Sequence, residues 1–392
     1  MSWNLFPRKE WLKQMTDVML YDNHYKGLLE VDWNFAKAPQ DPLANIHPYP
    51  ARFINEIPRH LIEKIGTPAR TVILDPFCGS GTTLVEAQRH NYDSVGVDLN
   101  PIACLISSVK TRPLPRNFQT TLQATADEAE KLYDDSIKIP EIPNIDHWFE
   151  KDIQKALSSL LFVIQRVTNK TIKNALRLAL SSIIVRVSNQ ESDTRYAAVS
   201  KNNTVADVFR NFILAGNKIA QAKANEKSTK SAKIFLQDIL TVSSDQIGKN
   251  VGLVVTSPPY PNAYEYWLYH KYRMWWLGYD PIEVRTYEIG ARPHYQKKNG
   301  QTEKDFYLQM KHVFDILTEC LVNGGHICFV VGRSIISGRI IDNGKLIRDI
   351  GENHRLHLVA DITREIDATK KSFNLKYGKI KEENILVFRK DK

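Results

Sequence analysis

The sequence predicts a doubly wound α/β domain that is interrupted by a mainly helical insertion. A strand-like run at 71–74 is followed by a glycine-rich turn, a helix at about 82–90 and a second strand-like run at 94–97. This order describes a βαβ unit, which requires parallel strands. Strand patterns then return after a long helical stretch, so distant segments are expected to complete one sheet. These later runs lie at 232–236, 251–255 and 326–331.

The elements outside this sheet follow from local signals. Residues 1–44 are interpreted as an N-terminal arm with one helix at 9–19, and a short helix at 58–65 is ended by Gly66. A long helix at 303–321 is closed by Gly324 and Gly325. The apolar runs 356–362 and 384–388 predict a terminal hairpin.

Residues 113–232 have a different pattern. Apolar residues recur at helical spacing in three segments, at 153–167, 171–187 and 205–223, and a polar loop follows at 223–233. The predicted organisation is therefore an arm at 1–44, an α/β domain made of 45–112 and 233–392, and a helical insertion at 113–232.

Composition restricts the class of protein only loosely. The 392 residues are 43% apolar and 25% charged, as in ordinary globular proteins. Lys and Arg number 53 against 44 Asp and Glu, and this excess suits a nucleic-acid partner without requiring one. The chain shows no signal-peptide pattern at its start and no run of about 18 apolar residues, so we expect a cytoplasmic protein without a membrane partner.

The four cysteines predict no metal site. Cys78, Cys104, Cys320 and Cys328 form no C-x-x-C pair, and each has apolar neighbours in the sequence. Reduced buried thiols are therefore expected rather than zinc ligands or disulfides.

A glycine-rich segment connects the first predicted strand to the following helix. Glycines let the backbone approach a ligand, and the start of a helix offers unpaired N–H groups. The segment lacks the Gly-Lys-Ser/Thr of a Walker loop and the spacing of a dinucleotide fingerprint. Asp98 ends the next strand, where it could accept hydrogen bonds from ribose hydroxyls or act as a structural cap. Asp238 ends a third strand, in a position to meet an adenine edge. The segment reads Asp75-Pro76-Phe77-Cys78-Gly79-Ser80-Gly81-Thr82-Thr83.

A second motif follows the run 251–255 and reads Thr256-Ser257-Pro258-Pro259-Tyr260. Two prolines cannot continue a strand ladder, so the strand must stop here. Ligands of open α/β sheets bind at the carboxyl ends of strands. A rigid corner with a hydroxyl, carbonyls and an aromatic ring suits a planar heterocycle that carries an amino group. A tight turn that only ends a buried strand would show the same sequence pattern.

The two motifs in this order resemble the S-adenosylmethionine-dependent DNA amino-methyltransferases. The resemblance covers 45–112 and 233–392. It implies a Rossmann-like methyltransferase sheet, S-adenosylmethionine as cofactor and double-stranded DNA as substrate. It also implies methyl transfer to the exocyclic amine of cytosine or adenine in a flipped-out base, without a metal or a covalent nucleophile.

The resemblance also implies roles for individual residues. Ser257 and the carbonyl of Pro258 would accept the amine hydrogens, beside Pro259, and Tyr260 would stack on the base. A serine at this position favours cytosine over adenine. The segment 46–53 would close over the methionine end of the cofactor, unless it is an ordinary proline-rich turn. The implied cofactor-binding residues are Tyr49, Pro50, Phe53, the loop from Asp75 to Thr83, Asp98, Leu99 and Asp238.

Contacts to nucleic acid are expected around this corner and in the insertion. Tyr264 and Tyr266 could contribute to a base pocket, whereas the tryptophans that follow are expected in the core. The polar stretch 285–304 could be a mobile loop that contacts phosphates or a solvated surface loop. The insertion is the candidate target-recognition region, and its polar run 188–196 could read bases or cap a helix. The basic candidates are Arg195, Arg292, Lys297 and Lys298.

Two other functions remain open at this point. RNA methyltransferases that act on exocyclic amines carry similar loops, although this sequence shows no recognisable RNA-binding domain. A non-catalytic DNA-binding subunit could retain the same fold. The sequence also leaves open whether a cognate restriction or defence partner exists.

Overall fold

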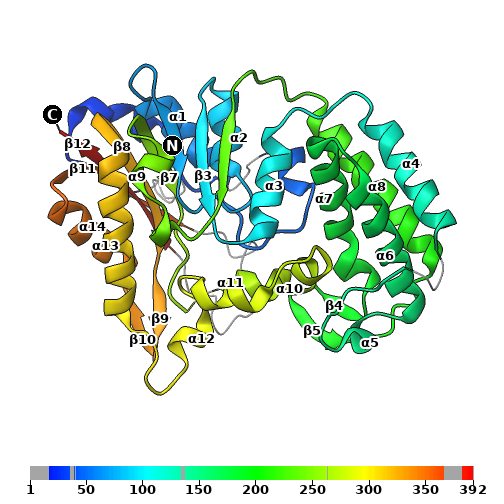
Figure 1. The fold of residues 1–392 in the computed structure, drawn as a ribbon. Helices are drawn as coiled ribbons and strands as arrows, with labels where there is room; N and C mark the ends of the chain where they lie inside the picture. Colours follow the sequence, from blue (N-terminus) through cyan, green and yellow to red (C-terminus); the bar gives the residue numbers. More distant parts are fainter. Residues whose placement is uncertain are drawn as a thin grey trace, which may run out of the picture.

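The computed structural model describes residues 17–35, 39, 41–133, 137–262, 264–365 and 382–391. Within these ranges, a sheet of eight strands forms the centre of the molecule (Figure 1). Strands β6, β3, β2, β7 and β8 run parallel to one another. Strands β12, β11 and β1 continue the sheet from β8 with antiparallel pairing. The predicted doubly wound α/β fold with a terminal antiparallel pair is confirmed. In spatial order the strands are β1 (Asp17–Leu20), β11 (Leu356–Glu365), β12 (Glu382–Lys390), β8 (Leu321–Gly332), β7 (Val251–Thr256), β2 (Val72–Asp75), β3 (Ser94–Asp98) and β6 (Ala232–Leu236).

Both faces of the sheet are covered, because successive side chains of a strand point to opposite faces. Leu74 and Val254 pack in the apolar cluster that contains residues of α13 and α14. Their neighbours Ile73 and Val255 pack in a second cluster, which contains residues of α1 and of the 3-10 segment η1. The covering elements are η1 (Asn23–Glu30), α1 (Glu56–Ile65), α2 (Thr82–Arg89), α9 (Ser244–Ile247), α13 (Glu303–Cys320) and α14 (Asn343–Asn353).

The insertion forms a helical body at one side of the sheet (Figure 1). Leu122, Leu176 and Phe212 from its helices share one apolar cluster with Ile106 of α3 and Trp276 of α10. The predicted helical character of this region therefore agrees with the structure. Its elements, with the flanking helices, are α3 (Pro101–Thr111), α4 (Phe118–Lys131), α5 (Ile145–Trp148), α6 (Lys151–Arg166), α7 (Lys170–Val187), β4 (Gln190–Ser192), β5 (Arg195–Ala198), α8 (Val205–Lys223) and α10 (Tyr266–Trp276).

The helix predicted at 9–19 is wrong where the structure describes it. Residues Asp17–Leu20 form strand β1, which pairs antiparallel with β11 from Asp17 opposite Thr363, while 9–16 lie outside the described residues. The partner strand lies more than 300 residues away, so no local pattern could reveal this pairing.

The stretch 285–304 is not a loop throughout. Part of it belongs to two short helices, α11 (Pro281–Tyr287) and α12 (Arg292–Tyr295). Ile289, Ala291 and Tyr295 are buried, which anchors this segment although its sequence is polar. The run 188–196 likewise forms most of the β4–β5 hairpin rather than a simple helix-capping loop.

Two sequence expectations concern burial. All four cysteines are buried with free thiols, as their apolar neighbours predicted, and Trp267 and Trp276 are buried in the core. No helix in the described ranges is both long and apolar enough to cross a membrane. The same ranges contain no cluster of three His, Cys, Asp or Glu side chains that could hold a metal ion.

Candidate active site

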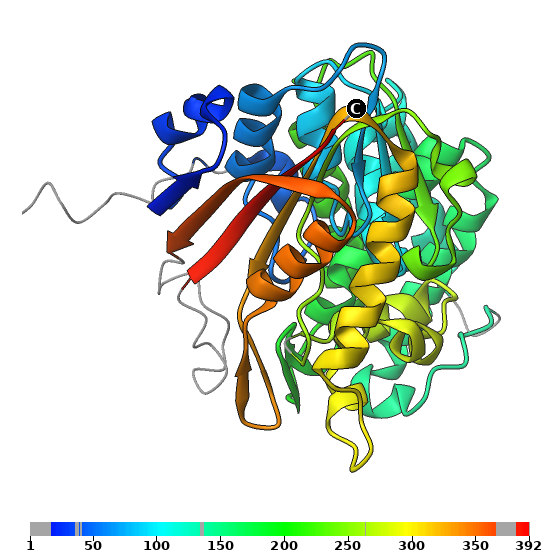
Figure 2. The ribbon, with the colours of Figure 1, turned by 90° about the vertical axis from the view of Figure 1, so that its left-hand side faces the viewer.

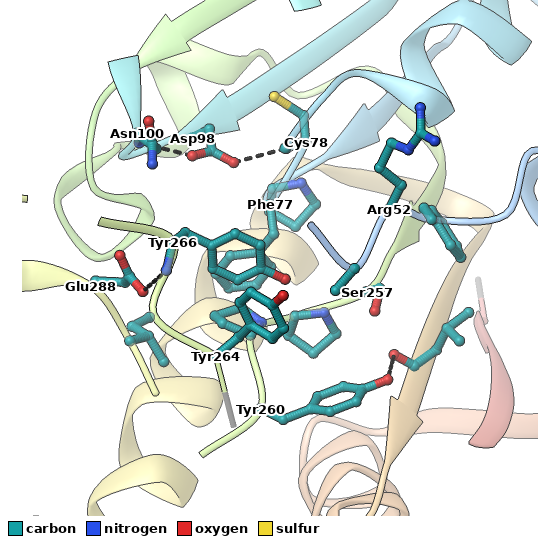
Figure 3. Close-up of a pocket in the computed structure, with 18 of the residues that line it drawn as sticks. Arg52, Phe77, Cys78, Asp98, Asn100, Ser257, Tyr260, Tyr264, Tyr266 and Glu288 are labelled. Carbon is teal, nitrogen blue, oxygen red and sulfur yellow. Dashed lines mark hydrogen bonds between the residues drawn. The ribbon is translucent and has the colours of Figure 1, made fainter. Parts of the chain in front are cut away.

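A cavity of about 740 Å³ opens beyond the carboxyl ends of β2, β3 and β7. Strand β2 lies between β7 and β3: the chain passes from β2 to β3 and β6 on one side, and then returns from β6 to β7 on the other side of β2. Such a topological switch point leaves a crevice in which open α/β sheets bind ligands. Figure 3 shows Asp98 on one side of this cavity, Ser257 on the other, and Phe77, Tyr264 and Tyr266 between them.

The glycine-rich loop has a backbone that requires its glycines. Gly79 and Gly81 have φ angles of +48° and +79°. A Cβ at Gly81 would lie 2.8 Å from Oγ of Ser107, and one at Gly79 would lie 3.1 Å from the hydroxyl of Tyr49. Larger residues would therefore strain the backbone and displace its neighbours.

One hydrogen bond joins the two sequence motifs directly, and a second joins the loop to the strand just before the Pro-Pro corner. Oγ1 of Thr256 donates to Oδ1 of Asp75 over 2.7 Å. Oγ1 of Thr83 donates to the carbonyl of Val255 over 3.2 Å. Burial raises the pKa of Asp75 to about 6, although hydrogen bonds from Thr256, Thr83 and the Phe77 amide favour its charged form. These bonds fix the glycine-rich loop against the strand that carries Ser257.

Asp98 orients the same loop from the neighbouring strand. Its Oδ2 accepts a hydrogen bond from the Gly79 amide over 2.7 Å, and its Oδ1 accepts one from the Asn100 amide over 2.8 Å. Burial raises the pKa of Asp98 to about 6. Carboxylate oxygens have capacity for further bonds. Beside it, Nδ2 of Asn100 is buried and has no hydrogen-bond partner within the described ranges. This unpaired donor and the carboxylate fit a polar ligand such as a ribose.

Asp238 lies at the rim of the cavity, at the end of β6. Its Oδ1 accepts a hydrogen bond from the Leu240 amide over 3.0 Å and caps the 3-10 turn η3 (Ile239–Thr241). Within the described ranges, its other carboxylate oxygen accepts no hydrogen bond and is available for a ligand.

The Pro-Pro corner is held by a chain of polar contacts from the terminal strand pair. The hydroxyl of Tyr260 donates to Oε1 of Glu383 over 3.1 Å (Figure 3). Arg364 donates to Oε2 of the same glutamate over 2.5 Å and to the carbonyl of Trp33 over 2.9 Å. Arg364 is buried, so its positive charge needs the carboxylate of Glu383 as a partner. The Tyr260 ring is thus fixed at its outer end.

An aromatic row lines the cavity between the two motifs. The rings of Tyr264 and Tyr266 lie 5.3 Å apart, and those of Tyr266 and Tyr49 are stacked at 5.7 Å. The backbone amides of Tyr266 and Trp267 each donate to Glu288 over 2.8 Å, at the start of α10. Burial raises the pKa of Glu288 to about 8.

Most of the predicted site residues line this one cavity, and six do not. Gly81 and Thr83 of the loop, and Pro50, are outside the lining. Arg195, Lys297 and Lys298 also lie outside it and are exposed on the surface. The lining includes Tyr49, Phe53, Asp75, Pro76, Phe77, Cys78, Gly79, Ser80, Thr82, Asp98, Leu99, Asp238, Ser257, Pro258, Pro259, Tyr260, Tyr264, Tyr266 and Arg292.

Five charged residues of the cavity lining were given no role from the sequence, namely Arg52, Glu288, Arg333, Arg364 and Glu383. Arg364 is a charged residue within a strand-forming segment, and that alone was a usable signal, because a buried charge needs a partner. Glu288 and Glu383 have no comparable local signal.

Comparisons with known proteins agree with this geometry. Residues 6–108 match the N6_N4_Mtase family, described as DNA methylase. The matched segment contains the glycine-rich loop and Asp98, and it also includes much of the arm, which lies outside the resemblance at 45–112 and 233–392. The predicted resemblance to S-adenosylmethionine-dependent DNA amino-methyltransferases is confirmed by this match and by the relatives below.

Two relatives cover more of the chain. The Type II methyltransferase M.MvaI of Kocuria varians is 26% identical over 266 residues, which are 62% of this chain and 57% of the relative. The Type II methyltransferase M.BsoBI of Geobacillus stearothermophilus is 24% identical over 276 residues, which are 60% of this chain and 53% of the relative. The chain therefore spans just over half the length of these relatives.

A solved structure of the rRNA methyltransferase AviRa from Streptomyces viridochromogenes also matches, with a TM-score of 0.34 and 10% identity. The match covers 89% of this chain and 90% of that one. This likeness is too distant to support an inference about function.

Proposed function

We propose that this protein transfers a methyl group from S-adenosylmethionine to an exocyclic amino group in double-stranded DNA, with cytosine as the preferred target base and adenine as the alternative. One observation carries the proposal. A single cavity joins the glycine-rich loop and Asp98 to the Ser257–Tyr260 corner, and hydrogen bonds fix the two motifs to each other. The DNA methylase match and the Type II relatives support the same class of reaction.

The cofactor would lie along the loop side of the cavity. Asp98 and Asn100 present an acceptor and a donor suited to a ribose, and Asp238 would meet the adenine edge. The aromatic side chains of Tyr49 and Phe53 would cover the methionine end. When bound there, S-adenosylmethionine supplies an electrophilic methyl group on a sulfonium.

The protein's own residues would position and polarise the acceptor amine. The lone pair of such an amine is delocalised into the ring, so alignment with the methyl group supplies much of the rate. The Ser257 hydroxyl and the Pro258 carbonyl would accept the amine hydrogens and favour the charge that develops on nitrogen. Tyr260, held by Glu383, would stack on the base. The preference for cytosine rests on the serine at position 257.

The flipped base would enter from DNA that is held across the cavity mouth. We propose the helical insertion as the target-recognition region, because its β4–β5 hairpin is tied to α10 by the ion pair of Arg273 with Asp193. The likeness to Type II methyltransferases also supports a cognate restriction partner for this protein.

The test is transfer of labelled methyl from S-adenosylmethionine to unmodified duplex DNA, followed by sequencing of the modified bases. Ser257→Ala is expected to lower transfer by at least about 100-fold, the range seen when a transition-state hydrogen-bond acceptor or donor is removed. Cofactor binding by calorimetry should be unchanged, because Ser257 lies on the base side of the cavity.

Other outcomes would replace the proposal. Labelling of tRNA or rRNA but not DNA would assign the protein to RNA methylation. Absence of cofactor binding would indicate a non-catalytic DNA-binding subunit. Full activity of Ser257→Ala would show that the assignment of the catalytic corner is wrong.

A further inference from the structure

A short β-hairpin extends past the end of the sheet beside the cavity mouth. Strands β9 (Ser334–Ile336) and β10 (Arg339–Ile341) pair antiparallel through a two-residue turn. Ser337 and Gly338 have φ angles of +49° and +82°, as a tight hairpin turn of this kind requires. Figure 2 shows the hairpin, in orange, projecting beyond the sheet beside the yellow segment that precedes α13.

The two faces of this hairpin have different surroundings. Ile336 and Ile341 are buried against Tyr295 of α12. The opposite face carries the cross-strand pair Ile335 and Ile340, and both residues line the cavity. Ile340 is 70% exposed, the highest fraction among the exposed large apolar side chains within the described ranges. A single exposed isoleucine is ordinary, but this one lies at the rim of the candidate active site.

The base of the hairpin is fixed to the catalytic corner. Asn262, two residues after Tyr260, donates from Nδ2 to the carbonyl of Ile335 over 2.8 Å. Its own amide donates to the carbonyl of Gly290 over 2.9 Å. Nδ2 of Asn343 donates to the carbonyl of Gly332 over 2.7 Å. The position of Ile340 is therefore set relative to Ser257 by the same segment that forms the corner.

Exposed basic side chains lie at the hairpin that carries Ile340 and on the segment after α12, whose Tyr295 packs against that hairpin. Arg333 and Arg339 are exposed on the hairpin, and Lys297 and Lys298 are exposed on the segment after α12. Arg333 has Glu382 at 4.0 Å, with both side chains about half exposed or more. Exposed positive charges around an apolar tip suit the phosphates on either side of a base step.

We propose that Ile340 is a wedge that enters the base stack of duplex DNA and fills the space left by the target nucleotide. This inference rests on the proposed function and deepens it. A base must leave the duplex to reach a closed cavity, and unstacking it has a cost. Proteins offset such a cost by inserting an apolar side chain between base steps. Ile340 presents that side chain at the entrance through which the base would pass.

The experiment compares kcat/KM for native duplex DNA and for the same DNA after heat denaturation, with labelled methyl as the readout. The variants are Ile340→Ala, Ile340→Leu and the control Leu308→Ala, whose leucine is 51% exposed on α13 and outside the cavity lining. Ile340 is exposed, so its truncation leaves the folded protein intact. We expect Ile340→Ala to lose about 10-fold or more on native DNA, whereas Ile340→Leu and Leu308→Ala stay within about two-fold. Transfer to denatured DNA should be unchanged in all three.

Two results would overturn the wedge. One is a loss below two-fold for Ile340→Ala on native DNA, and the other is an equal loss on native and denatured DNA. Failure of the proposed function has a separate signature, because the wild-type protein would then methylate neither form of DNA. A hairpin that docks on protein would leave all DNA kinetics of Ile340→Ala unaltered.

Discussion

Two buried carboxylates, Asp75 and Asp98, determine how the candidate site is held. Each ends a parallel strand, and each accepts backbone or side-chain hydrogen bonds from the glycine-rich loop or the Pro-Pro corner. Burial raises the pKa of each to about 6. They are therefore charged at neutral pH but protonate within a range that an experiment can reach.

The first prediction concerns Asp98 and pH. Its pKa is raised by burial to about 6 from an ordinary value of 3.8, so the acceptor form is present at pH 7 and is lost as pH falls through about 6. Cofactor affinity should therefore decrease between pH 7 and pH 5. Asp98→Asn should weaken affinity by about 10-fold or more at pH 7, since a hydrogen bond to a charged group contributes roughly 1.5–3 kcal/mol.

Calorimetry at several pH values measures this effect. In Asp98→Asn the dependence on pH should be reduced to the part that Asp75 contributes. Asp245→Asn, at an exposed position of α9, is the matched control and should bind as the wild type does. An Asp98→Asn variant with wild-type affinity and the same pH profile would refute a role for this carboxylate in cofactor binding.

Elements that are distant in sequence complete the site. The terminal pair β11 and β12 supplies Arg364 and Glu383, which hold the Tyr260 ring. The start of α10 is capped by Glu288, which orients Tyr266 beside Tyr264. The antiparallel half of the sheet thus supports a corner that belongs to the parallel half.

A second prediction tests that support. Glu383→Gln retains an acceptor for Tyr260 but removes the charge that pairs with Arg364, and Tyr260→Phe retains the ring but loses its hydroxyl. Each should lower the rate of methyl transfer by about 10-fold, equivalent to roughly 1.4 kcal/mol, with cofactor affinity unchanged.

Single-turnover rates and calorimetry provide the two readouts. Glu382→Gln is the matched control, because this neighbouring glutamate is half exposed and lies 4.0 Å from Arg333. It should retain the wild-type rate. Equal losses in rate and in cofactor affinity for Glu383→Gln would indicate a general structural defect instead of positioning of Tyr260.

The elements that the sequence predicted well are those with a local signal. The βαβ unit, the helices of the insertion and strand β6 have strong periodicity, and their observed bounds lie close to the expected ones. The site residues in the two motifs could be found because glycine and proline restrict the backbone there. Other features could not be predicted, because tertiary contacts alone place them. These are strand β1, helix α12 and the side chains of Glu288 and Glu383.

The insertion and elements next to the candidate site share one core. Ile106 of α3 and Trp276 of α10 pack with Leu122, Leu176 and Phe212 of the insertion. The sequence predicts a helical insertion at 113–232, and this packing makes the elements of the candidate site depend on it.

A third prediction follows from this shared core. Urea unfolding followed by far-UV circular dichroism and by tryptophan fluorescence should give coincident transitions, because tryptophans lie in the shared cluster. Phe212→Ala should destabilise the protein by about 3–5 kcal/mol, the usual cost of truncating a buried phenylalanine. The midpoint should decrease by the same amount in both signals. Two separate transitions, with only one of them shifted, would show that the insertion folds on its own.

The pairing of β1 with β11 has a consequence for how the protein is made. A ribosome releases residues 17–20 more than 300 residues before residues 356–365. Strand β1 must therefore remain without its partner while the residues between the two strands emerge, since domains fold as their segments become available. An unpaired edge invites contact with other chains. Expression conditions that slow elongation should prolong this exposed interval and increase aggregation of the nascent protein.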